Sequence, residues 1–460
     1  MRFPAKSLGS ILLASLAALG GAAGMSHAGA TARSAAAAPV TLTVAYQKFP
    51  PAPYWDDLFW KNIQAQLAAQ HSNITLKLDP INASEGDYYT KIDLALRSAS
   101  TAPDLIREDS FLVGSDATAG YLLPLDKYLA SWPEYKQQWF PNMQQITTFN
   151  GHNYGIMNGT DVRLIWYNKT IFQKAGLPPT WQPHSWADIL SAARAIKAKV
   201  PGVIPMNLYS GIPADEASTM QGFEMLLYGT KDPLYDYGAK KWIVSSKGIL
   251  DTLTFIQQVY NPAALLGPTN DIALSGNAGS IVTNQLLPAG KLGIAIDGSW
   301  LPQAWAPSGS HPWPQWSSVM GHAKMPTQFG QAPNYVTLSG GWAYSIGARS
   351  AHADAAFQVL KLANTQAMLG QYDANIQNIG VRKDETDVKA YAAIPLSPFY
   401  SSLVTFTQFR PAFPAYPRIS NQVDLAMENV MTGQFKPADA MTAYQQAVTG
   451  IVGASNVETR

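Results

Sequence analysis

An acid and a base stand together in the middle of the chain, just ahead of an apolar stretch. Asp161 and Arg163 precede Leu-Ile-Trp-Tyr-Asn-Lys (164–169), which reads as a strand running into a helix. Such a pair can supply catalysis, bind a ligand through hydrogen bonds, or form only a surface ion pair. Charged residues make up 14% of the chain, below the roughly 25% of an average soluble protein, so the placement calls for an explanation.

Polar residues also follow two predicted strands nearer the N-terminus. Gln47 and Lys48 come after the alternating stretch 41–46, and Asp109 and Ser110 come after the strand that starts near Pro103. Ligands of parallel α/β sheets bind beyond the carboxyl ends of the strands, so these four residues are candidates for a binding site. A second interpretation of Asp109, as the N-cap of a helix over 110–121, stays open.

The sequence lacks the common motifs of catalysis and cofactor binding. It contains no G-x-S-x-G, G-x-G-x-x-G, G-x-x-x-x-G-K-[ST] or H-E-x-x-H. No two of the seven histidines have metal-ligand spacing, and there is no cysteine to complete a site. We therefore expect no metal, no cofactor and no enzymatic activity. Acidic pairs such as Glu108-Asp109 leave an exported glycosidase as an alternative, because catalytic carboxylates are usually distant in sequence.

The elements that must position these residues follow from hydrophobic periodicity. Strands over 41–46, 73–78 and 103–106 alternate with helices over 54–70 and 88–99, an order that predicts a parallel sheet with helices on both faces. The pattern restarts after Asn158, which indicates a second α/β lobe. Its predicted elements are the strand 164–169, a helix ending at Gly176, a helix over 186–199 with the capping box Ser185/Asp188, strands over 203–210, 292–296 and 335–338, and helices over 246–260, 352–364 and 438–452.

The N-terminus has the pattern of an exported protein. Residues 1–30 combine the basic Arg2 and Lys6 with an apolar stretch from Ile11, which predicts a signal peptide, and 31–39 reads as a flexible tail. The chain has no cysteine, so it cannot carry a lipid at the cleavage site or form a disulfide. We expect the protein to be periplasmic or secreted.

Overall composition narrows the class of ligand. The formal charge is only +1, which disfavours a nucleic-acid partner because such binding needs a clustered basic surface. Aromatic residues are plentiful, with 13 Trp, 21 Tyr and 16 Phe.

Four segments in order resemble family 1 extracellular solute-binding proteins, the sugar-capturing subunits of ABC importers, similar to maltose- and trehalose-binding proteins. They are APDLIREDS with AGYLLPLDKYL (102–110, 119–129), GHNYGIM with LIWYNKTIFQKAGLPP (151–157, 164–179), GKLGIAIDGSW (290–300) and SGGWAYSIG (339–347). The resemblance implies a two-lobed type II binding-protein fold, in which each lobe is a mainly parallel sheet flanked by helices and the ligand cleft lies between the lobes. It places the N-terminal lobe at 40–158 and 320–385, and the C-terminal lobe at 159–319 and 386–460.

The resemblance also implies roles for individual residues. Asp109 resembles the family's hydroxyl-binding carboxylate, and Asp161 stands where relatives place an acidic ligand contact. Arg163, two residues on, faces the same side of an extended chain, so we expect it to be a structural or surface partner that orients the Asp161 carboxylate. Trp300 matches a stacking Trp of the family, and Gly341 and Trp342 match a segment that approaches the sugar. Arg418 and Tyr209 are the other implied substrate-binding residues, and Tyr209 stands in a loop that lines the cleft in relatives. Asp215 and Glu216 in the same loop are predicted to be solvated.

The resemblance implies a neutral di- or oligosaccharide ligand, ABC permease subunits as partners, and a monomer. Sugar chemistry then explains the composition, because Trp and Tyr faces pack on the C–H face of a pyranose while Asp, Asn, Gln and Arg bond neighbouring hydroxyls. A polyamine, glycerol-phosphate or iron on the same fold stays as an alternative. Iron binders of this fold need adjacent tyrosines, and Tyr88-Tyr89 provide such a pair.

Overall fold

The computed structural model describes residues 38–48, 52–83 and 85–460. The predicted signal peptide, and the tail up to residue 37, lie outside the described residues. Within the described ranges, no helix is both long enough and apolar enough to cross a membrane. Residues from Pro39 to Arg460 form one compact unit.

The first sheet has the order β2-β1-β3-β15-β6. Its strands are β1 (Val40–Gln47), β2 (Ile74–Ile81), β3 (Leu105–Asp109), β6 (Ile156–Met157) and β15 (Trp342–Ile346). β1 runs parallel to β2 and β3, but β15 is antiparallel to both β3 and β6. The predicted parallel order is therefore confirmed for the first three strands and wrong for the other half of the sheet.

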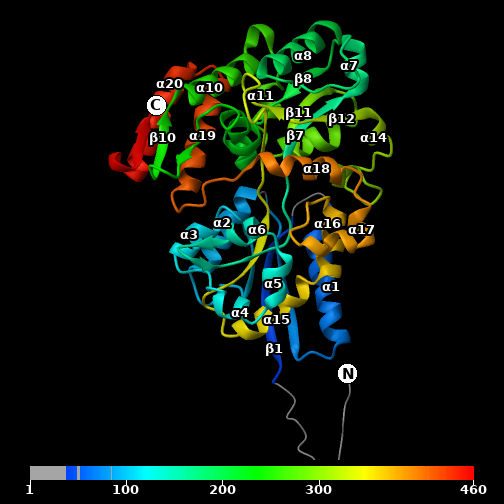
Figure 1. The fold of residues 1–460 in the computed structure, drawn as a ribbon, viewed down its shortest axis with the longest axis vertical. Coiled ribbons are helices and arrows are strands. Elements are labelled where there is room, and N and C mark those ends of the chain that lie inside the picture. The colour runs from blue at the N-terminus through cyan, green and yellow to red at the C-terminus, as the bar shows by residue number, and fades with distance from the viewer. Residues whose placement is uncertain (1–37, 49–51, 84) are drawn as a thin grey trace, which may run out of the picture. The chain divides into compact units, whose positions relative to one another are not determined.

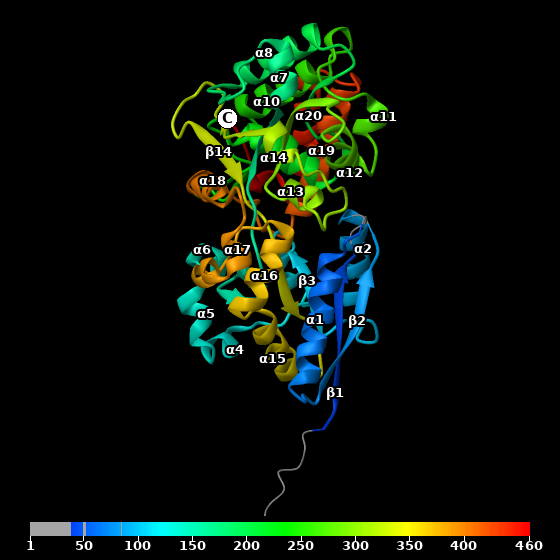
Figure 2. The ribbon, with the colours of Figure 1, turned by 90° about the vertical axis from the view of Figure 1, so that its right-hand side faces the viewer.

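Helices cover both faces of the first sheet (Figure 1, Figure 2). One face packs on α1 (Trp55–Ala69), α15 (Ala353–Ala363) and α16 (Gln366–Ile376), and the other packs on α2 (Glu85–Leu96). Alternate residues of β1 divide between the two faces, as a strand requires: Leu42, Val44 and Tyr46 join the first cluster and Ala45 joins the second.

The second sheet has the order β12-β7-β11-β8. Its strands are β7 (Arg163–Asn168), β8 (Ile204–Asn207), β11 (Leu292–Gly298) and β12 (Met320–Ala323). Only β8 and β11 are parallel, while β7 is antiparallel to both β11 and β12. The expectation of a mainly parallel sheet is therefore wrong for this lobe.

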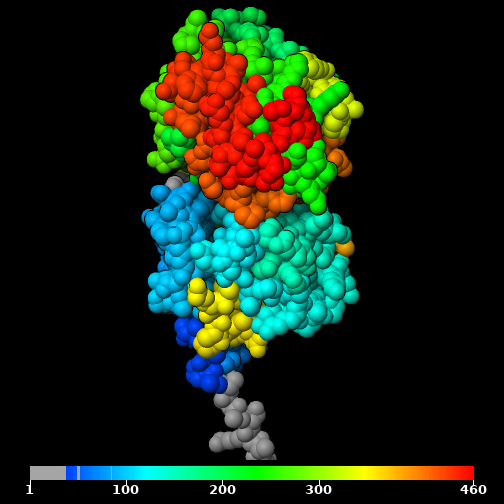
Figure 3. Space-filling view, turned by 90° about the vertical axis from the view of Figure 1, so that its left-hand side faces the viewer, coloured from blue at the N-terminus to red at the C-terminus, as the bar shows by residue number. Residues whose placement is uncertain are grey.

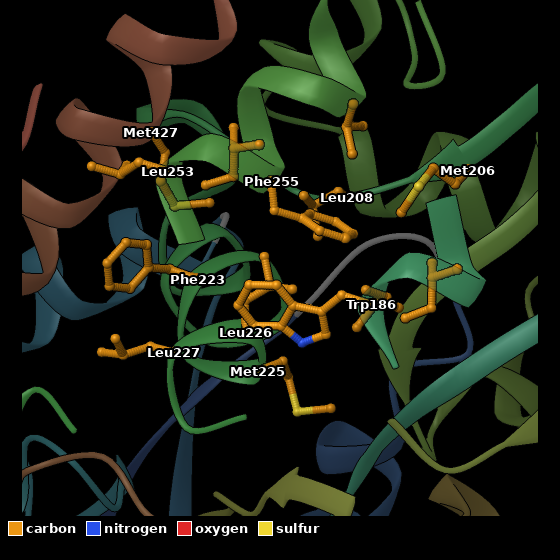
Figure 4. Packing of buried hydrophobic residues seen from close by; sticks show 14 of the residues in the cluster. Trp186, Met206, Leu208, Phe223, Met225, Leu226, Leu227, Leu253, Phe255 and Met427 are labelled. Carbon is orange, nitrogen blue, oxygen red and sulfur yellow. The ribbon is translucent and has the colours of Figure 1, made fainter. Parts of the chain in front are cut away.

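The second lobe buries apolar residues on both faces of this sheet, and the larger cluster lies on the face that carries Ile165 and Tyr167. The helices that contribute are α7 (Lys169–Ala175), α8 (Trp186–Lys199), α10 (Lys247–Tyr260), α19 (Tyr416–Met431) and α20 (Pro437–Val452). Figure 4 shows the centre of this cluster, where the rings of Trp186 and Phe255 meet edge to face with centroids 5.5 Å apart. In Figure 3, α19 and α20 (orange to red) cover one side of the lobe.

The sequence signals at the ends of two helices are confirmed. α7 ends at Gly176, which has φ +73° and so adopts the left-handed conformation that favours glycine. Ser185 and Asp188 form a reciprocal capping box at the start of α8. The helix over 110–121 is shorter than predicted: α3 spans Val113–Thr118, and its N-cap residue is Leu112 rather than Asp109.

One predicted lobe boundary is wrong. β12 starts at Met320 and pairs with β7, so residues 320–323 belong to the second sheet. β13 (Met325–Pro326) and β14 (Tyr335–Leu338) pair with each other, and β14 pairs with β16 (Thr407–Gln408). The chain therefore re-enters the first sheet at β15, after Ser339–Gly341, rather than at residue 320.

Shorter elements complete the described chain. The remaining helices are α4 (Asp126–Ala130), α5 (Pro133–Gln138), α6 (Pro141–Gln145), α9 (Met225–Leu227), α11 (Asn270–Ala273), α12 (Ala278–Ile281), α13 (Leu301–Trp305), α14 (Trp316–Val319), α17 (Lys389–Ala392) and α18 (Ser397–Leu403), with π-helical turns at Ser218–Glu224 and Val282–Leu286. The remaining strands are β4 (Thr148–Phe149), β5 (His152–Asn153), β9 (Tyr235–Asp236), β10 (Lys241–Ser245) and β17 (Val457–Thr459).

Candidate functional site

The two glycines before β15 bond to two of the predicted site residues, Asp161 and Ser110. The amide of Gly340 donates to Asp161 Oδ1 at 2.9 Å, and the carbonyl of Gly341 accepts from the amide of Ser110 at 3.1 Å. Gly341 has φ +122°, and a Cβ at this position would run into the carbonyl oxygen of Gly159. Only glycine fits here, because both the backbone conformation and the available space exclude a side chain.

Asp109 lies at the carboxyl end of β3, buried to 4% exposure. Its carboxylate accepts from Arg410 Nη2 at 2.5 Å and from the Tyr89 hydroxyl at 2.8 Å. The Ser110 hydroxyl lies 3.4 Å from the same carboxylate. Asp109 is thus a buried carboxylate with charged and neutral donors, the type of group that can exchange such donors for ligand hydroxyls.

Asp161 and Arg163 form an ion pair, as one of the open interpretations held, but it is largely buried, since the side chain of Arg163 is 7% exposed and that of Asp161 13%. The Arg163 guanidinium lies 4.8 Å from the ring centroid of Trp300 and donates through Nε to Gln221 at 3.4 Å. Asp161, Arg163 and Trp300 therefore lie in one group, and Asp161 links that group to the Gly340 amide.

Trp342 opens β15 directly opposite Asp109 in the antiparallel ladder. One face of its ring carries the Arg107 guanidinium at 3.7 Å, and Arg107 also lies 3.5 Å from Gln47 Oε1. Gln47 donates to the carbonyl of Ala83 at 3.3 Å, so it belongs to the same first-lobe group.

Two other predicted site residues have separate partners. The Lys48 ammonium lies over the ring of Tyr54 at 4.5 Å. Tyr209 is buried in the second lobe and donates to Asp297 Oδ2 at 2.8 Å. Burial raises the pKa of Asp297 to about 6, and the hydrogen bonds from Gly298 and Tyr209 offset part of that effect. Neither Lys48 nor Tyr209 contacts Asp109 or Asp161.

The structure does not bring Arg418 to this group. Arg418 lies on the exposed side of α19, whereas Tyr416 and Ser420 of the same helix are buried and bond to Glu216. Successive helical residues turn by about 100°, so a residue two positions from Tyr416 points to the opposite side.

The arginine at the junction is Arg410, which the sequence analysis missed. Arg410 bonds Asp109 through Nη2 and Glu216 through Nη1 at 2.9 Å, so it joins β3 of the first lobe to the second lobe. A Cβ on Gly340 would lie 3.1 Å from Arg410 Nη2, which places this arginine beside the two glycines as well. Its only sequence signal is that it is an isolated cation between Phe409 and Pro411 in an aromatic stretch.

The loop residues Asp215 and Glu216 are not the solvated pair that the sequence suggests. Glu216 is 5% exposed and accepts from Arg410, Tyr416 and Ser420. Burial and the charge of Glu216 raise the pKa of Asp215 to about 7. Asp215 lies against Gly86 at the start of α2, because a Cβ on Gly86 would collide with its carboxylate.

The tyrosine pair does not offer two free hydroxyls to a metal. Tyr88 donates to the carbonyl of Arg107 at 2.6 Å, while Tyr89 turns to Glu85 and Asp109. Within the described ranges, no three His, Cys, Asp or Glu side chains are arranged to hold a metal ion.

A small cavity of about 10 Å³ lies at the junction, lined in part by Ser110, Phe111, Ser339 and Arg410. It has room for about one water molecule. A sugar ring can therefore enter between these residues only if the first-lobe and second-lobe groups separate.

Comparisons with known proteins agree with this architecture. The family of bacterial extracellular solute-binding proteins matches residues 52–368. An uncharacterised ABC transporter extracellular-binding protein of Pyrococcus horikoshii is 28% identical over 142 residues, 30% of this chain and 31% of that protein, so the match spans about a third of its length. The galactooligosaccharide-binding protein of Bacillus subtilis is 24% identical over 366 residues, 78% of this chain and 79% of that protein.

A solved structure extends the likeness to the whole fold. An ABC transporter solute-binding protein of Thermotoga lettingae, bound with α-D-tagatose, has a TM-score of 0.76 and 22% identity, covering 90% of this chain and 100% of its own. This likeness shows the two-lobed type II fold. With a family match over 52–368 and this fold, the chain belongs to the bacterial extracellular solute-binding proteins.

Proposed function

We propose that this protein captures a sugar, a di- or oligosaccharide, between its two lobes and delivers it to the membrane subunits of an ABC importer. Family membership supports the solute-binding part of the proposal. Relatives described as a galactooligosaccharide-binding protein and as a protein bound with α-D-tagatose support the sugar. The predicted signal peptide supports action outside the cytoplasm, in the periplasm or medium, where we propose that the protein acts as a monomer.

The observation that carries the proposal is the convergence of carboxylates and indole rings on Gly340 and Gly341. Asp161 bonds the Gly340 amide, and Ser110, next to Asp109, bonds the Gly341 carbonyl. Trp300 and Trp342 belong to the same two groups. A pyranose needs this combination, because its C–H face packs on a ring while its hydroxyls bond carboxylates.

Opening and closing of the lobes follows from the size of the junction cavity. A space of about 10 Å³ is far below the roughly 300 Å³ at which ligand pockets begin, so the ligand enters an open form. A ligand then stabilises the closed form only through contacts that it makes with both lobes. Asp109 from the first lobe and Asp161 at the crossing are the two carboxylates that we assign to this role.

A panel of mono-, di- and oligosaccharides tests the proposal, read by thermal shift and calorimetry, since a ligand that binds the native state raises its melting temperature. We expect at least one di- or oligosaccharide to bind. Asp161→Ala should weaken that binding tenfold or more, about 1.4 kcal/mol, while Arg418→Met should not. A panel with no sugar ligand, or equal affinity of the Asp161→Ala variant, contradicts the proposal.

The proposal is of a binding protein without turnover. Purified protein should release no chromogenic aglycone from aryl glycosides, and Asp109→Asn should leave that result unchanged. Release of aglycone that Asp109→Asn abolishes would instead favour an exported glycosidase.

A further inference from the structure

Carboxylates outnumber cations at the junction of the lobes. Glu85 and Asp109 from the first lobe face Asp215 and Glu216 from the second. Arg410 is the cation that bonds into this set, with Asp109 at 2.5 Å and Glu216 at 2.9 Å. One guanidinium neutralises the charge of one carboxylate. Four ionised carboxylates would therefore leave a strong negative potential in a poorly solvated place.

Tyr89 shows the excess of acceptors directly. Its hydroxyl lies 2.5 Å from Glu85 Oε1 and 2.8 Å from Asp109 Oδ2. A phenol has a single proton to donate, so it cannot satisfy both carboxylates. The second contact needs a donor on the other side, which is either a proton on Glu85 or a positively charged group.

Glu224 is a second and independent observation. It is 0% exposed, and neither of its carboxylate oxygens accepts a hydrogen bond from any described residue. The charged groups that it senses most are Glu216, Arg410 and Arg163, which places it against the same cluster. The Tyr416 hydroxyl lies close enough to Glu224 to offset part of the rise in its pKa, but its hydrogen bond goes to Glu216 at 3.3 Å. A buried acceptor without a donor costs stability unless a donor or a positive charge is supplied.

We propose that the sugar taken up at this junction carries a positively charged amino group, which Asp215, Glu216 and Glu85 receive. This inference rests on the proposed function and replaces the expectation of a neutral ligand. An ammonium brings three donors and a positive charge to a place rich in acceptors, and hydrogen bonds between ions are about twice as strong as neutral ones. The rings of Trp300 and Trp342, together with Asp161, remain available to bind the sugar itself.

The proposal includes an exchange of protons for the ligand. In the closed form, burial with the charges of Glu216 and Glu85 raises the pKa of Asp215 to about 7, and Arg410 offsets part of that effect. Burial and the charge of Asp109 raise the pKa of Glu85. Around pH 7 Asp215 is therefore partly protonated in the closed, ligand-free form, so an ammonium that replaces its proton releases that proton to solvent.

Calorimetry with a matched pair of ligands tests the proposal. The pair is the glucosamine disaccharide, which is cationic, and its N-acetylated form, which is neutral; maltose, galactobiose and spermidine complete the panel. We expect the cationic disaccharide to bind at least tenfold more tightly than its acetylated form at pH 7. Its binding heat should change with the ionisation enthalpy of the buffer, because protons are released.

Variants at the cluster separate charge recognition from shape. Glu216→Gln and Asp215→Asn should each weaken the cationic disaccharide at least tenfold and leave neutral sugars within twofold. Asp215→Asn is the safer variant, because Asp215 makes no ion pair with Arg410. Asp271→Asn, an equal change of charge at an exposed position, is the control.

The possible outcomes distinguish failure of this inference from failure of the proposed function. If neutral sugars bind as tightly as the cationic one, the inference is overturned and the proposed function stands. If no sugar binds, both fail, and binding of spermidine alone would assign a polyamine instead. If the cationic disaccharide binds but Asp215→Asn and Glu216→Gln leave its affinity unchanged, the inference is wrong about this cluster.

Discussion

At the scale of single residues, Arg410 is the most constrained side chain of the junction. It is 6% exposed, bonds one carboxylate from each lobe, and lies 4.2 Å over the ring of Phe111. The charges of Asp109 and Glu216 raise its pKa above the usual value despite burial. Removing one partner of a buried ion pair is costly because the other charge stays buried and uncompensated.

Arg410→Met should therefore lower the free energy of unfolding by about 3–5 kcal/mol. The reason is that Asp109 and Glu216 lose their shared donor. Urea denaturation followed by circular dichroism measures the change. Arg418→Met on exposed α19 is the matched control and should stay within about 0.5 kcal/mol of the parent. Equal midpoints for both variants would show that Arg410 contributes little.

Gly341 allows a second prediction for a single residue. Gly341→Ala places a Cβ against the carbonyl of Gly159 at φ +122°, so it should destabilise the fold by more than about 1 kcal/mol. Gly450→Ala, on the exposed side of α20 with open space around it, should instead stabilise by about 0.5–1 kcal/mol. Thermal melts of the two variants should shift in opposite directions, and a shift in the same direction contradicts this account.

At the scale of elements, the start of α8 shows how local sequence positions a whole helix. Asp188 Oδ2 accepts from the amides of His184 and Ser185 at 2.8 and 3.0 Å, and Ser185 Oγ accepts from the Asp188 amide. These bonds satisfy amides at the first turn that no helical carbonyl can reach. α8 then packs against β11 and α7 in the main cluster of the second lobe.

Asp188→Ala should lower the free energy of unfolding by about 1–2 kcal/mol, because it leaves two amides without an acceptor. Equilibrium denaturation measures the loss. Asp188→Asn keeps an acceptor oxygen and should recover part of it. No difference between Ala and Asn would mean that the capping oxygen does not stabilise the helix.

Elements with a strong local signal were predictable from the sequence, and elements set by distant contacts were not. The 186–199 helix follows from its cap and periodicity, and β1, β7 and β11 follow from apolar alternation or apolar runs. The antiparallel direction of β15 and β7 depends on how the chain crosses between lobes, which no local pattern records. The boundary at 320 failed for the same reason, because β12 pairs with a strand about 150 residues earlier.

The residues of the candidate site also divide into those that the sequence predicts and those that only distant contacts reveal. Asp109, Ser110, Trp342, Gly341 and Asp161 follow strand ends or family segments, and the structure brings them together. Arg410, Glu216 and Glu224 carry no such signal, because their role comes only from burial against the opposite lobe or crossing. Their function as ligand contacts remains a prediction.

At the scale of the whole molecule, we expect closure of the lobes to be linked to protons. Asp215 lies against Gly86 of the other lobe, and its pKa is raised to about 7 by burial and by Glu216 and Glu85, with Arg410 acting in the opposite sense. In an open form the carboxyl regains water and its pKa returns towards the ordinary value near 4. Between about pH 4 and 7 the closed form therefore holds more protons, so raising the pH favours opening.

Ligand-free protein should open as the pH rises from 5 to 8. The bias towards opening is at most about 1.4 kcal/mol per pH unit for one such group. Small-angle X-ray scattering should show a larger radius of gyration at pH 8. Asp215→Asn should reduce this pH dependence, whereas Asp271→Asn should keep it. A radius that is constant across this range contradicts the linkage.

The exposed side of α19 has a practical consequence when combined with the lack of cysteine. Arg418 faces solvent on the side of α19 opposite to Tyr416 and Ser420, whose hydroxyls bond Glu216 at the junction. Arg418→Cys would create the single thiol of the chain, so an environment-sensitive fluorophore would attach at one defined point. The labelled protein would act as a reagentless optical sensor whose emission reports each opening and closing event, without any change to the residues that we assign to the ligand.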